Sequence, residues 1–237
     1  FGTSVTHATP SYMLHLHQAI MESEYKREDF KWRIGISGAE PYSEQLRNKM
    51  EKSLGIEVYN CYGMSELNGP GVAFECQLRN GRHVWEDRYI MEIVNPETLE
   101  PVEDGETGEL VMTILCRDAM PLLRYRTRDL THVITEPCPC GRTHRRIARF
   151  TGRTDDMLII NGVNVFPSQI EEVLLKAPGV GANYLIVVDK KGDMDKLTVQ
   201  VEVTPEAFAD DARVLNKLKE HLQDEMSALI TIKPVVE

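Results

Sequence analysis

The segment from Tyr62 to Glu66 combines residue types that suit a nucleotide and its metal ion. It reads Tyr-Gly-Met-Ser-Glu and directly follows residues 56–60, a run typical of a β-strand. A turn in this place offers backbone amides and a hydroxyl to a phosphate, an aromatic ring to a base and a carboxylate to Mg²⁺, which prefers oxygen ligands. Taken alone, however, the segment also fits a simple capped turn between a strand and a helix.

A second candidate is Asp129, at the end of Tyr-Arg-Thr-Arg-Asp at residues 125–129. A carboxylate that follows a strand-like run can accept hydrogen bonds from two vicinal hydroxyls, such as those of a ribose. The alternative is a surface turn in which Asp129 is paired with the neighbouring arginines.

A third candidate is the long segment that begins with Gly-Arg-Thr-Asp-Asp at residues 152–156. It continues through a glycine turn at Gly162 to a helix that Pro167 opens. An arginine, a linker with paired acids, a glycine turn and a proline-initiated helix make a more specific combination than either shorter motif.

The cysteines form a separate pattern. There are five, an odd number that argues against a disulfide framework and favours reduced thiols or metal ligands. Cys138 and Cys140 need two further ligands for a tetrahedral zinc site, and Cys76 and His83 are the nearest plausible pair. Free thiols in a proline-stiffened turn, or His144 as a competing ligand, remain open alternatives. Cys61 and Cys116 are interpreted as small buried residues.

The elements that position these residues are read from hydrophobic patterns. Strands at 32–36 and 56–60 flank a helix that is expected to start at Pro41 and end at Gly55, which forms a βαβ unit with parallel strands. Both candidate turns then fall at the carboxyl ends of parallel strands, where ligands bind in open α/β sheets.

The rest of the chain changes character twice. From about residue 83 to 135, short strands separated by turns predict a small antiparallel sheet or barrel. Beyond Gly152, a hairpin, a helix at 167–176, two strands and a long helix predict a compact α+β unit. The long helix carries one apolar stripe, made of Leu215, Leu218, Leu222, Met226 and Leu229. The predicted fold class is therefore α/β with α+β, in two domains at 1–150 and 151–237.

Composition limits the possible partners. The 237 residues include 27 Lys and Arg against 37 Asp and Glu, a net charge of −10, which argues against a general binder of nucleic acid or anionic membranes. No apolar run approaches the roughly 18 residues of a membrane span and no signal peptide is recognised, so a cytoplasmic protein is expected. The chain begins with Phe1 rather than Met, and we interpret it as a fragment.

Taken together, the motifs at 37–41, 62–66, 125–129 and 152–156 resemble, in order, those of the adenylate-forming acyl-CoA synthetase superfamily. Three stretches are similar to the phenylacetate–CoA ligase family specifically: Ala-Met-Pro-Leu-Leu-Arg-Tyr at 119–125, Pro-Cys-Pro-Cys-Gly-Arg-Thr at 137–143 and Asn-Gly-Val-Asn-Val-Phe-Pro-Ser-Gln-Ile-Glu at 161–171. The resemblance covers residues 35 to 237.

The resemblance implies a two-step ligase. ATP and an aryl acid would give an acyl-adenylate and pyrophosphate, and coenzyme A would then displace AMP. Glu66 would hold Mg²⁺ and, with Arg153, serve as a catalytic residue. The residues implied in nucleotide binding are Ser37, Gly38, Ala39, Glu40, Pro41, Asn60, Cys61, Tyr62, Gly63, Met64, Ser65, Asp129 and Arg153. Tyr62 would stack on adenine, and Asp129 would bind the ribose hydroxyls.

The same resemblance implies a mobile small domain. Asp155 would be the hinge about which this domain swings, and Gly162 would line the coenzyme A tunnel. The family's phosphate loop would precede residue 1 and its adenylation lysine would follow Glu237, so this polypeptide alone should be poorly active. Arg128 stands where glycine is common in the family.

Other functions remain open. One alternative is a nucleotide-binding homologue that does not catalyse, and a less favoured one is a zinc-stabilised nucleic-acid module, suggested by Arg142, Arg145, Arg146 and Arg149. The expected partners are an aryl acid, ATP and coenzyme A, with no nucleic acid and no membrane, and the resemblance implies a homodimer. The preferred acid is not determined by the sequence.

Overall fold

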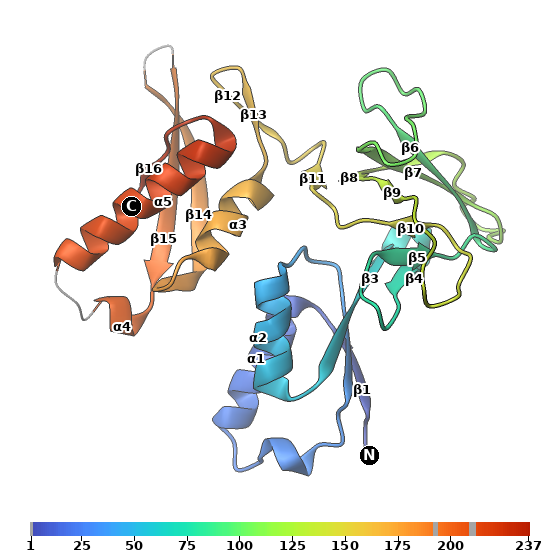
Figure 1. Ribbon diagram of the computed structural model, residues 1–237, viewed down its shortest axis with the longest axis horizontal. Coiled ribbons are helices and arrows are strands. Elements are labelled where there is room, and N and C mark those ends of the chain that lie inside the picture. The colour runs from blue at the N-terminus through green and yellow to red at the C-terminus, as the bar shows by residue number, and fades with distance from the viewer. Residues whose placement is uncertain (1, 192–193, 209–211) are drawn as a thin grey trace. The chain divides into compact units, whose positions relative to one another are not determined.

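The computed structural model describes residues 2–191, 194–208 and 212–237 (Figure 1). The chain divides into two compact units, Phe1–Thr154 and Asp155–Glu237, each with its own hydrophobic core. All residues predicted to bind the nucleotide lie in the first unit, and Asp155 and Gly162 lie in the second.

A seven-stranded mixed sheet forms the centre of the first unit. Its strands β1, β2 and β3 are parallel, and the following strands are antiparallel. In spatial order they are β1 (Val5–Ala8), β2 (Ile34–Ser37), β3 (Glu57–Met64), β4 (Gly69–Glu75), β5 (Arg82–Val84), β10 (Arg146–Ile147) and β9 (Val133–Ile134). The predicted βαβ unit is confirmed, and the short strand β1 extends it by one further parallel strand that the sequence analysis missed.

Two helices, α1 (Pro10–Met21) and α2 (Glu44–Leu54), lie side by side against the parallel strands (Figure 1). Met13, Met50 and Leu54 are buried with Val58 in the core between them and β3. The prediction that Pro41 opens α2 was wrong, because the side chain of Ser43 accepts a hydrogen bond from the amide of Leu46 and caps the helix two residues later. The predicted left-handed cap at Gly55 is confirmed, with φ of 61°.

The antiparallel sheet predicted after residue 83 has four strands. In spatial order they are β11 (Gly152–Arg153), β8 (Tyr125–Thr131), β7 (Gly108–Ile114) and β6 (Tyr89–Val94). Leu110 and Met112 of β7 are buried in the same core as Tyr62 and Val72 of the mixed sheet. Two short 3-10 turns, η1 (Arg27–Asp29) and η2 (Ser65–Leu67), complete this unit.

The second unit begins with a hairpin of β12 (Leu158–Ile160) and β13 (Val163–Val165). The sheet β14 (Val180–Lys191), β15 (Met194–Val203) and β16 (Val235–Val236) shares a core with α3 (Pro167–Lys176) and α5 (Ala212–Ile230), and α4 (Pro205–Phe208) is a short turn of helix. The predicted bounds of α3 are confirmed. On α5, Leu222 and Met226 are buried as predicted, but Leu229 is 42% exposed and Ile230 takes its place in the core.

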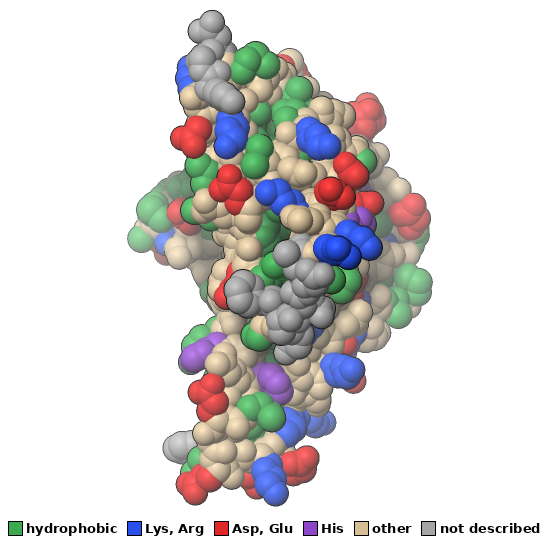
Figure 2. All heavy atoms as spheres, turned by 90° about the vertical axis from the view of Figure 1, so that its left-hand side faces the viewer, with side chains coloured by type: hydrophobic (Ala, Val, Ile, Leu, Met, Phe, Trp, Pro, Cys, Tyr) green, Lys and Arg blue, Asp and Glu red, His purple; other side chains and the backbone are tan. Residues whose placement is uncertain are grey.

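Acidic and basic side chains are interspersed over the face drawn in Figure 2. Among the described residues, no helix has the length and hydropathy to cross a membrane.

Candidate functional site

Three of the predicted nucleotide-binding residues are joined by hydrogen bonds in the first unit. The hydroxyl of Tyr62 donates to Oδ2 of Asp129 at 2.7 Å, and Nη1 of Arg153 donates to Oδ1 of the same carboxylate at 2.9 Å. The three residues come from β3, β8 and β11, and Arg153 lies directly across from Asp129 in the antiparallel ladder. The fold therefore brings together side chains that are up to 91 residues apart in the chain.

Asp129 lies inside strand β8 and is 8% exposed, so the expectation that it follows a strand was wrong, and so was the alternative of a surface turn. It forms an ion pair with Arg153. Burial and the neighbouring Asp129 carboxylate raise the pKa of Tyr62 well above its ordinary value. Tyr62 therefore keeps its proton at neutral pH and acts as the donor.

The backbone explains the unusual residue before Asp129. Arg128 has φ of +70°, a left-handed conformation that glycine adopts without strain and a residue with a Cβ does not. The pairing of β7 with β8 shifts register between Glu109 and Val111, so the strand is irregular here. The position where glycine is common in the resembled family is thus one where the local backbone favours glycine.

The segment Ser37–Pro41 begins beside the middle of β3, because Ser37 of β2 pairs with Asn60. A Cβ on Gly38 would lie 2.4 Å from the carbonyl oxygen of Cys61, so only glycine permits this approach of the two strands. The Ser37 hydroxyl is fully buried and has no hydrogen-bond partner among the described residues. Burial raises the pKa of the Cys61 thiol to about 11, so this thiol is protonated at neutral pH.

The other members of this segment face outward. Ala39 has φ of +68°, and Pro41 is exposed. The Glu40 carboxylate accepts hydrogen bonds from the hydroxyl of Ser11 at 2.7 Å and from its amide at 3.1 Å, at the N-terminus of α1. Glu40 therefore joins the segment to this helix.

The first part of the turn predicted at 62–66 is instead part of strand β3, which continues to Met64 and pairs with β4. Gly63 lies against the backbone of Gly69 in that pairing. The turn comes later, at Ser65–Leu67, with Ser65 exposed and Glu66 half-buried. Nη1 of Arg117 donates to the Glu66 carbonyl oxygen at 2.6 Å, which anchors this turn by its backbone.

Gly162 lies in the second unit, at the tip of the hairpin between β12 and β13. It has φ of +83° and Asn161 has φ of +49°, the left-handed pair of a two-residue hairpin turn. Apart from its two chain neighbours, no atom of the described residues lies within 4 Å of the place a Cβ would take. A side chain here would strain the turn but would meet open space.

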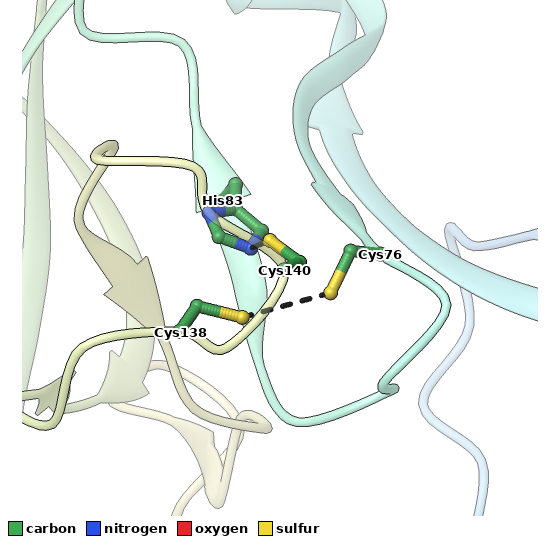
Figure 3. A group of neighbouring side chains, drawn as sticks. All are labelled: Cys76, His83, Cys138 and Cys140. Carbon is green, nitrogen blue, oxygen red and sulfur yellow. Dashed lines mark hydrogen bonds between the residues drawn. The ribbon is translucent and has the colours of Figure 1, made fainter.

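The four predicted metal ligands converge in the first unit, as Figure 3 shows. Cys76 follows β4, His83 lies on β5, and Cys138 and Cys140 lie on the loop between β9 and β10. Their ligand atoms all lie within 4.8 Å of one another. Sγ of Cys76 is 3.7 Å from Sγ of Cys138, and Sγ of Cys140 is 3.5 Å from Nε2 of His83.

The sulfur–sulfur and sulfur–nitrogen distances match those of a tetrahedral zinc centre. With Zn–S bonds of about 2.3 Å and Zn–N bonds of about 2.0 Å, tetrahedral angles place two sulfurs about 3.8 Å apart and a sulfur and a nitrogen about 3.5 Å apart. Nδ1 of His83 lies 3.3 Å from the carbonyl oxygen of His144, a contact that leaves Nε2 to face the thiols. His144, the competing ligand, thus supports the cluster through its carbonyl and is not a member of it.

The thiols differ in exposure and ionisation. The backbone and side chain of Arg142 lower the pKa of Cys140 to about 7, the backbone hydrogen bond being the larger cause. Burial raises the pKa of Cys76. Cys116 is exposed, so its interpretation as a buried residue was wrong.

Two residues behind Tyr62 were not identified from the sequence. The ring of Phe150 lies 4.6 Å from that of Tyr62, and the Arg82 guanidinium lies 4.3 Å from the centre of the Phe150 ring. Arg82 is only 4% exposed, and an arginine in a short strand carries no sequence signal that predicts such burial.

With this geometry established, comparisons with known proteins place the chain. A family model described as "AMP-binding enzyme" matches residues 1–113, and one described as "AMP-binding enzyme C-terminal domain" matches residues 162–237. The fold and the two matched segments define an adenylate-forming enzyme architecture. The chain belongs to the AMP-binding enzyme family.

Within this family, the chain is most informatively compared with individual curated proteins. The chain is 47% identical to a phenylacetate-coenzyme A ligase of Aromatoleum evansii, over 87% of this chain and 47% of the relative. It is 43% identical to a phenylacetate-coenzyme A ligase of Escherichia coli K12, over 86% of this chain and 46% of the relative. The chain thus spans about half the length of the curated relatives it matches.

A solved structure of a 2-hydroxyisobutyryl-CoA ligase, in its postadenylation state with an acyl-AMP, is 28% identical to the chain and matches with a TM-score of 0.88. That match covers all of this chain and 51% of the solved one.

Proposed function

We propose that the full-length protein is an AMP-forming acid–thiol ligase that activates an aryl acid, phenylacetate or a close relative, and transfers the acyl group to coenzyme A. The observation that carries the proposal is the bonded set of Tyr62, Asp129 and Arg153, in a chain 43–47% identical to phenylacetate-coenzyme A ligases. Residues 1–150 would belong to the large nucleotide-binding domain and 151–237 to its small partner.

The chemistry assigns each group a task. A carboxylate is a poor acyl donor, and its attack on the α-phosphate of ATP releases pyrophosphate and leaves AMP as a good leaving group. The protein must hold two anions together and neutralise the developing charge. Arg153 would supply a cation beside the nucleotide, Asp129 would bind the ribose hydroxyls, and Glu66 would hold Mg²⁺ through its carboxylate.

The adenine would lie between the segment at 37–41 and the end of β3, with the Tyr62 ring against it and Met64 and Ser65 toward the phosphates. The buried Ser37 hydroxyl supports this placement, because it has no hydrogen-bond partner among the described residues and lies at the carboxyl end of β2, where a ligand can supply one.

The second half-reaction would involve the second unit. Asp155 is its first residue, a place suited to a hinge. Gly162, with open space at its Cβ position, would let the thin pantetheine chain of coenzyme A pass the backbone. The thiol would then attack the acyl carbonyl and expel AMP.

The test is acid-dependent release of pyrophosphate by full-length protein, measured with a panel of aryl and alkyl acids. We expect phenylacetate or a related aryl acid to give the highest kcat/KM and to form an acyl-CoA when coenzyme A is added. Binding of ATP with no release on any acid would overturn the enzymatic proposal in favour of a non-catalytic homologue.

The nucleic-acid alternative has weaker support. Arg145 pairs with Asp104, Arg149 pairs with Glu44, and Arg146 is 2% exposed. These three arginines therefore form ion pairs or are buried within the protein itself. Tight binding of random RNA would revive this alternative.

We further propose that Cys76, His83, Cys138 and Cys140 hold a structural Zn²⁺. Three soft sulfurs, one imidazole and spacings that match a tetrahedron support zinc, and four protein ligands leave no open position for water. Metal analysis of the purified protein should find one zinc per chain, and Cys138→Ser should lose it. Purified protein without bound metal would contradict the proposal.

Two expectations from the sequence also remain proposals. The five cysteines carry no disulfide, which supports a reducing, cytoplasmic compartment. A homodimer would be tested by light scattering of the full-length protein.

A further inference from the structure

Arg82 and His83 are consecutive residues on β5, so their side chains leave opposite sides of the strand. His83 joins the Cys/His cluster, and Arg82 lies over the Phe150 ring. One short strand therefore carries a member of the cluster and a residue that supports the nucleotide site.

The contacts of Arg82 form a short chain of packed groups. Its guanidinium lies 4.3 Å from the centre of the Phe150 ring and 6.0 Å from that of Tyr62, and it donates a hydrogen bond to the Ala148 carbonyl oxygen. The Phe150 and Tyr62 rings are 4.6 Å apart and inclined by 50°. Tyr62 in turn donates to Asp129. The guanidinium thus fixes Phe150, and Phe150 fixes one side of the Tyr62 ring.

The charge of Arg82 has an unusual environment. A buried arginine is ordinarily paired with a carboxylate. The nearest candidate, Glu75, lies across the ladder, but its carboxylate binds Arg47 at 2.8 Å and the Asn60 amide at 2.7 Å. No ion pair of Arg82 is found in the described part of the chain, so the cation is stabilised by the nearby charge of Glu75 without direct contact, by aromatic faces and by a carbonyl. An aliphatic residue would fill this space without that desolvation cost, so the charge indicates a specific task.

β5 is a short strand that depends on its neighbours. It has three residues, pairs with β4 and β10, and follows the connection that contains Cys76. A metal that binds Cys76, His83, Cys138 and Cys140 would tie the end of β4, β5 and the β9–β10 loop together. Arg82 directly precedes His83 in the chain. A metal that fixes His83 therefore also fixes the backbone from which the Arg82 side chain extends.

We propose that Arg82 is a positioning residue that couples the metal cluster to the nucleotide site, by holding Phe150 and through it the ring of Tyr62. This rests on the proposed function, in which Tyr62 packs on the adenine and the cluster holds Zn²⁺. Arg82 does not touch the nucleotide; it orders the ring that does. The site for ATP is then sensitive to a metal that takes no part in the chemistry.

The test compares Arg82→Met, which removes the charge, with Arg82→Lys, which keeps it, in full-length protein. We expect Arg82→Met to raise the Kd of a non-hydrolysable ATP analogue about tenfold, measured by calorimetry, while the KM for coenzyme A stays within twofold. Arg82→Lys should recover part of the loss. General destabilisation would instead affect all substrates together.

Arg79→Met is the matched control. Arg79 lies in the β4–β5 connection, over the ring of Tyr59 at 5.0 Å, and its ion pair is with Glu51 at 2.8 Å. No contact between Arg79 and Phe150 is found among the described residues. Arg79→Met should leave ATP affinity within twofold. If Arg82→Met does not fold, Phe150→Leu interrupts the same chain of contacts and should weaken ATP binding alike.

Metal removal supplies the second arm. Chelation of zinc from the native protein should weaken ATP binding about tenfold, but chelation from Arg82→Met should add less than threefold, because both changes act through one route. Equal losses in both proteins would overturn the coupling, and wild-type affinity in Arg82→Met would overturn the role of Arg82. Failure of wild-type protein to bind the analogue would overturn the proposed nucleotide site itself.

Discussion

The hydroxyl of Tyr62 donates a 2.7 Å hydrogen bond to Oδ2 of Asp129, a residue 67 positions further along the chain. Arg153 binds the other oxygen of the same carboxylate. One acidic group therefore holds an aromatic ring and a guanidinium in fixed relation, each on a different strand. A ligand that bonds to the Asp129 carboxylate would therefore lie close to both the Tyr62 ring and the Arg153 guanidinium.

Asp129→Ala should lower ATP affinity at least tenfold in full-length protein, because it removes the proposed ribose acceptor and the group that orders Tyr62 and Arg153. Tyr62→Phe is the matched control: it keeps the ring and removes one hydrogen bond, which is worth about 1 kcal/mol, so its loss should stay below about tenfold. Equilibrium binding of an ATP analogue measures both. An unchanged dissociation constant in Asp129→Ala would refute the ribose assignment.

Gly162→Leu should separate the two half-reactions. We expect pyrophosphate release to stay within twofold of wild type and thioester formation to fall at least tenfold, because the side chain would obstruct the proposed coenzyme A passage. Gly105→Leu places the same residue at another exposed glycine with positive φ, at +100°, and controls for backbone strain. Equal losses in both half-reactions would contradict the tunnel role.

Arg128→Gly should stabilise the protein. A left-handed backbone costs a residue with a Cβ about 1 kcal/mol, which glycine avoids. A gain of this size raises Tm by about 2–4 °C in a protein of this length, measured by calorimetry. Arg128→Ala keeps the Cβ and removes the distant 4.0 Å pairing with Glu109, and it should not stabilise. A Tm rise in both variants would mean that charge, and not backbone strain, is responsible.

Thiol labelling should report the cluster directly. In native protein, an alkylating reagent at pH 7.5 should modify exposed Cys116 and spare Cys61, whose raised pKa keeps it protonated. After chelation, Cys76, Cys138 and Cys140 should become reactive. Peptide mass spectrometry identifies the modified sites, and Cys116→Ser removes the fast reaction. Rapid labelling of the three cluster thiols before chelation would argue against bound metal.

Local patterns predicted much of this fold. Pro167 and the spacing of Ile170, Val173 and Leu174 correctly defined α3, because a proline at the first turn and an inward stripe determine a helix with little help from elsewhere. The four cluster residues were also identified correctly as neighbours, because cysteine and histidine are recognisable from the sequence as residues that can share one metal ion.

The predictions from sequence were wrong where tertiary contacts determine the local structure. Asp129 was expected to follow a strand, whereas pairing with β7 and β11 keeps residues 125–131 in one strand. Arg82 and Phe150 were missed because their contact depends on three-dimensional packing, which the sequence pattern does not indicate. Pattern analysis detects the residues that contact a ligand by their chemistry, but not the residues that hold them.

The pairing of β4 with β5 places Phe74 across from His83 and Glu75 across from Arg82. A slip of one residue would turn the imidazole away from the three thiols and would send the guanidinium to the wrong side of the sheet. Zinc bound during folding would therefore favour the native alignment over this one-residue slip, because the slipped strand takes His83 away from the thiols. The ion would then help to set the strand register, and the position of the Tyr62 ring proposed to pack on adenine would depend on that register.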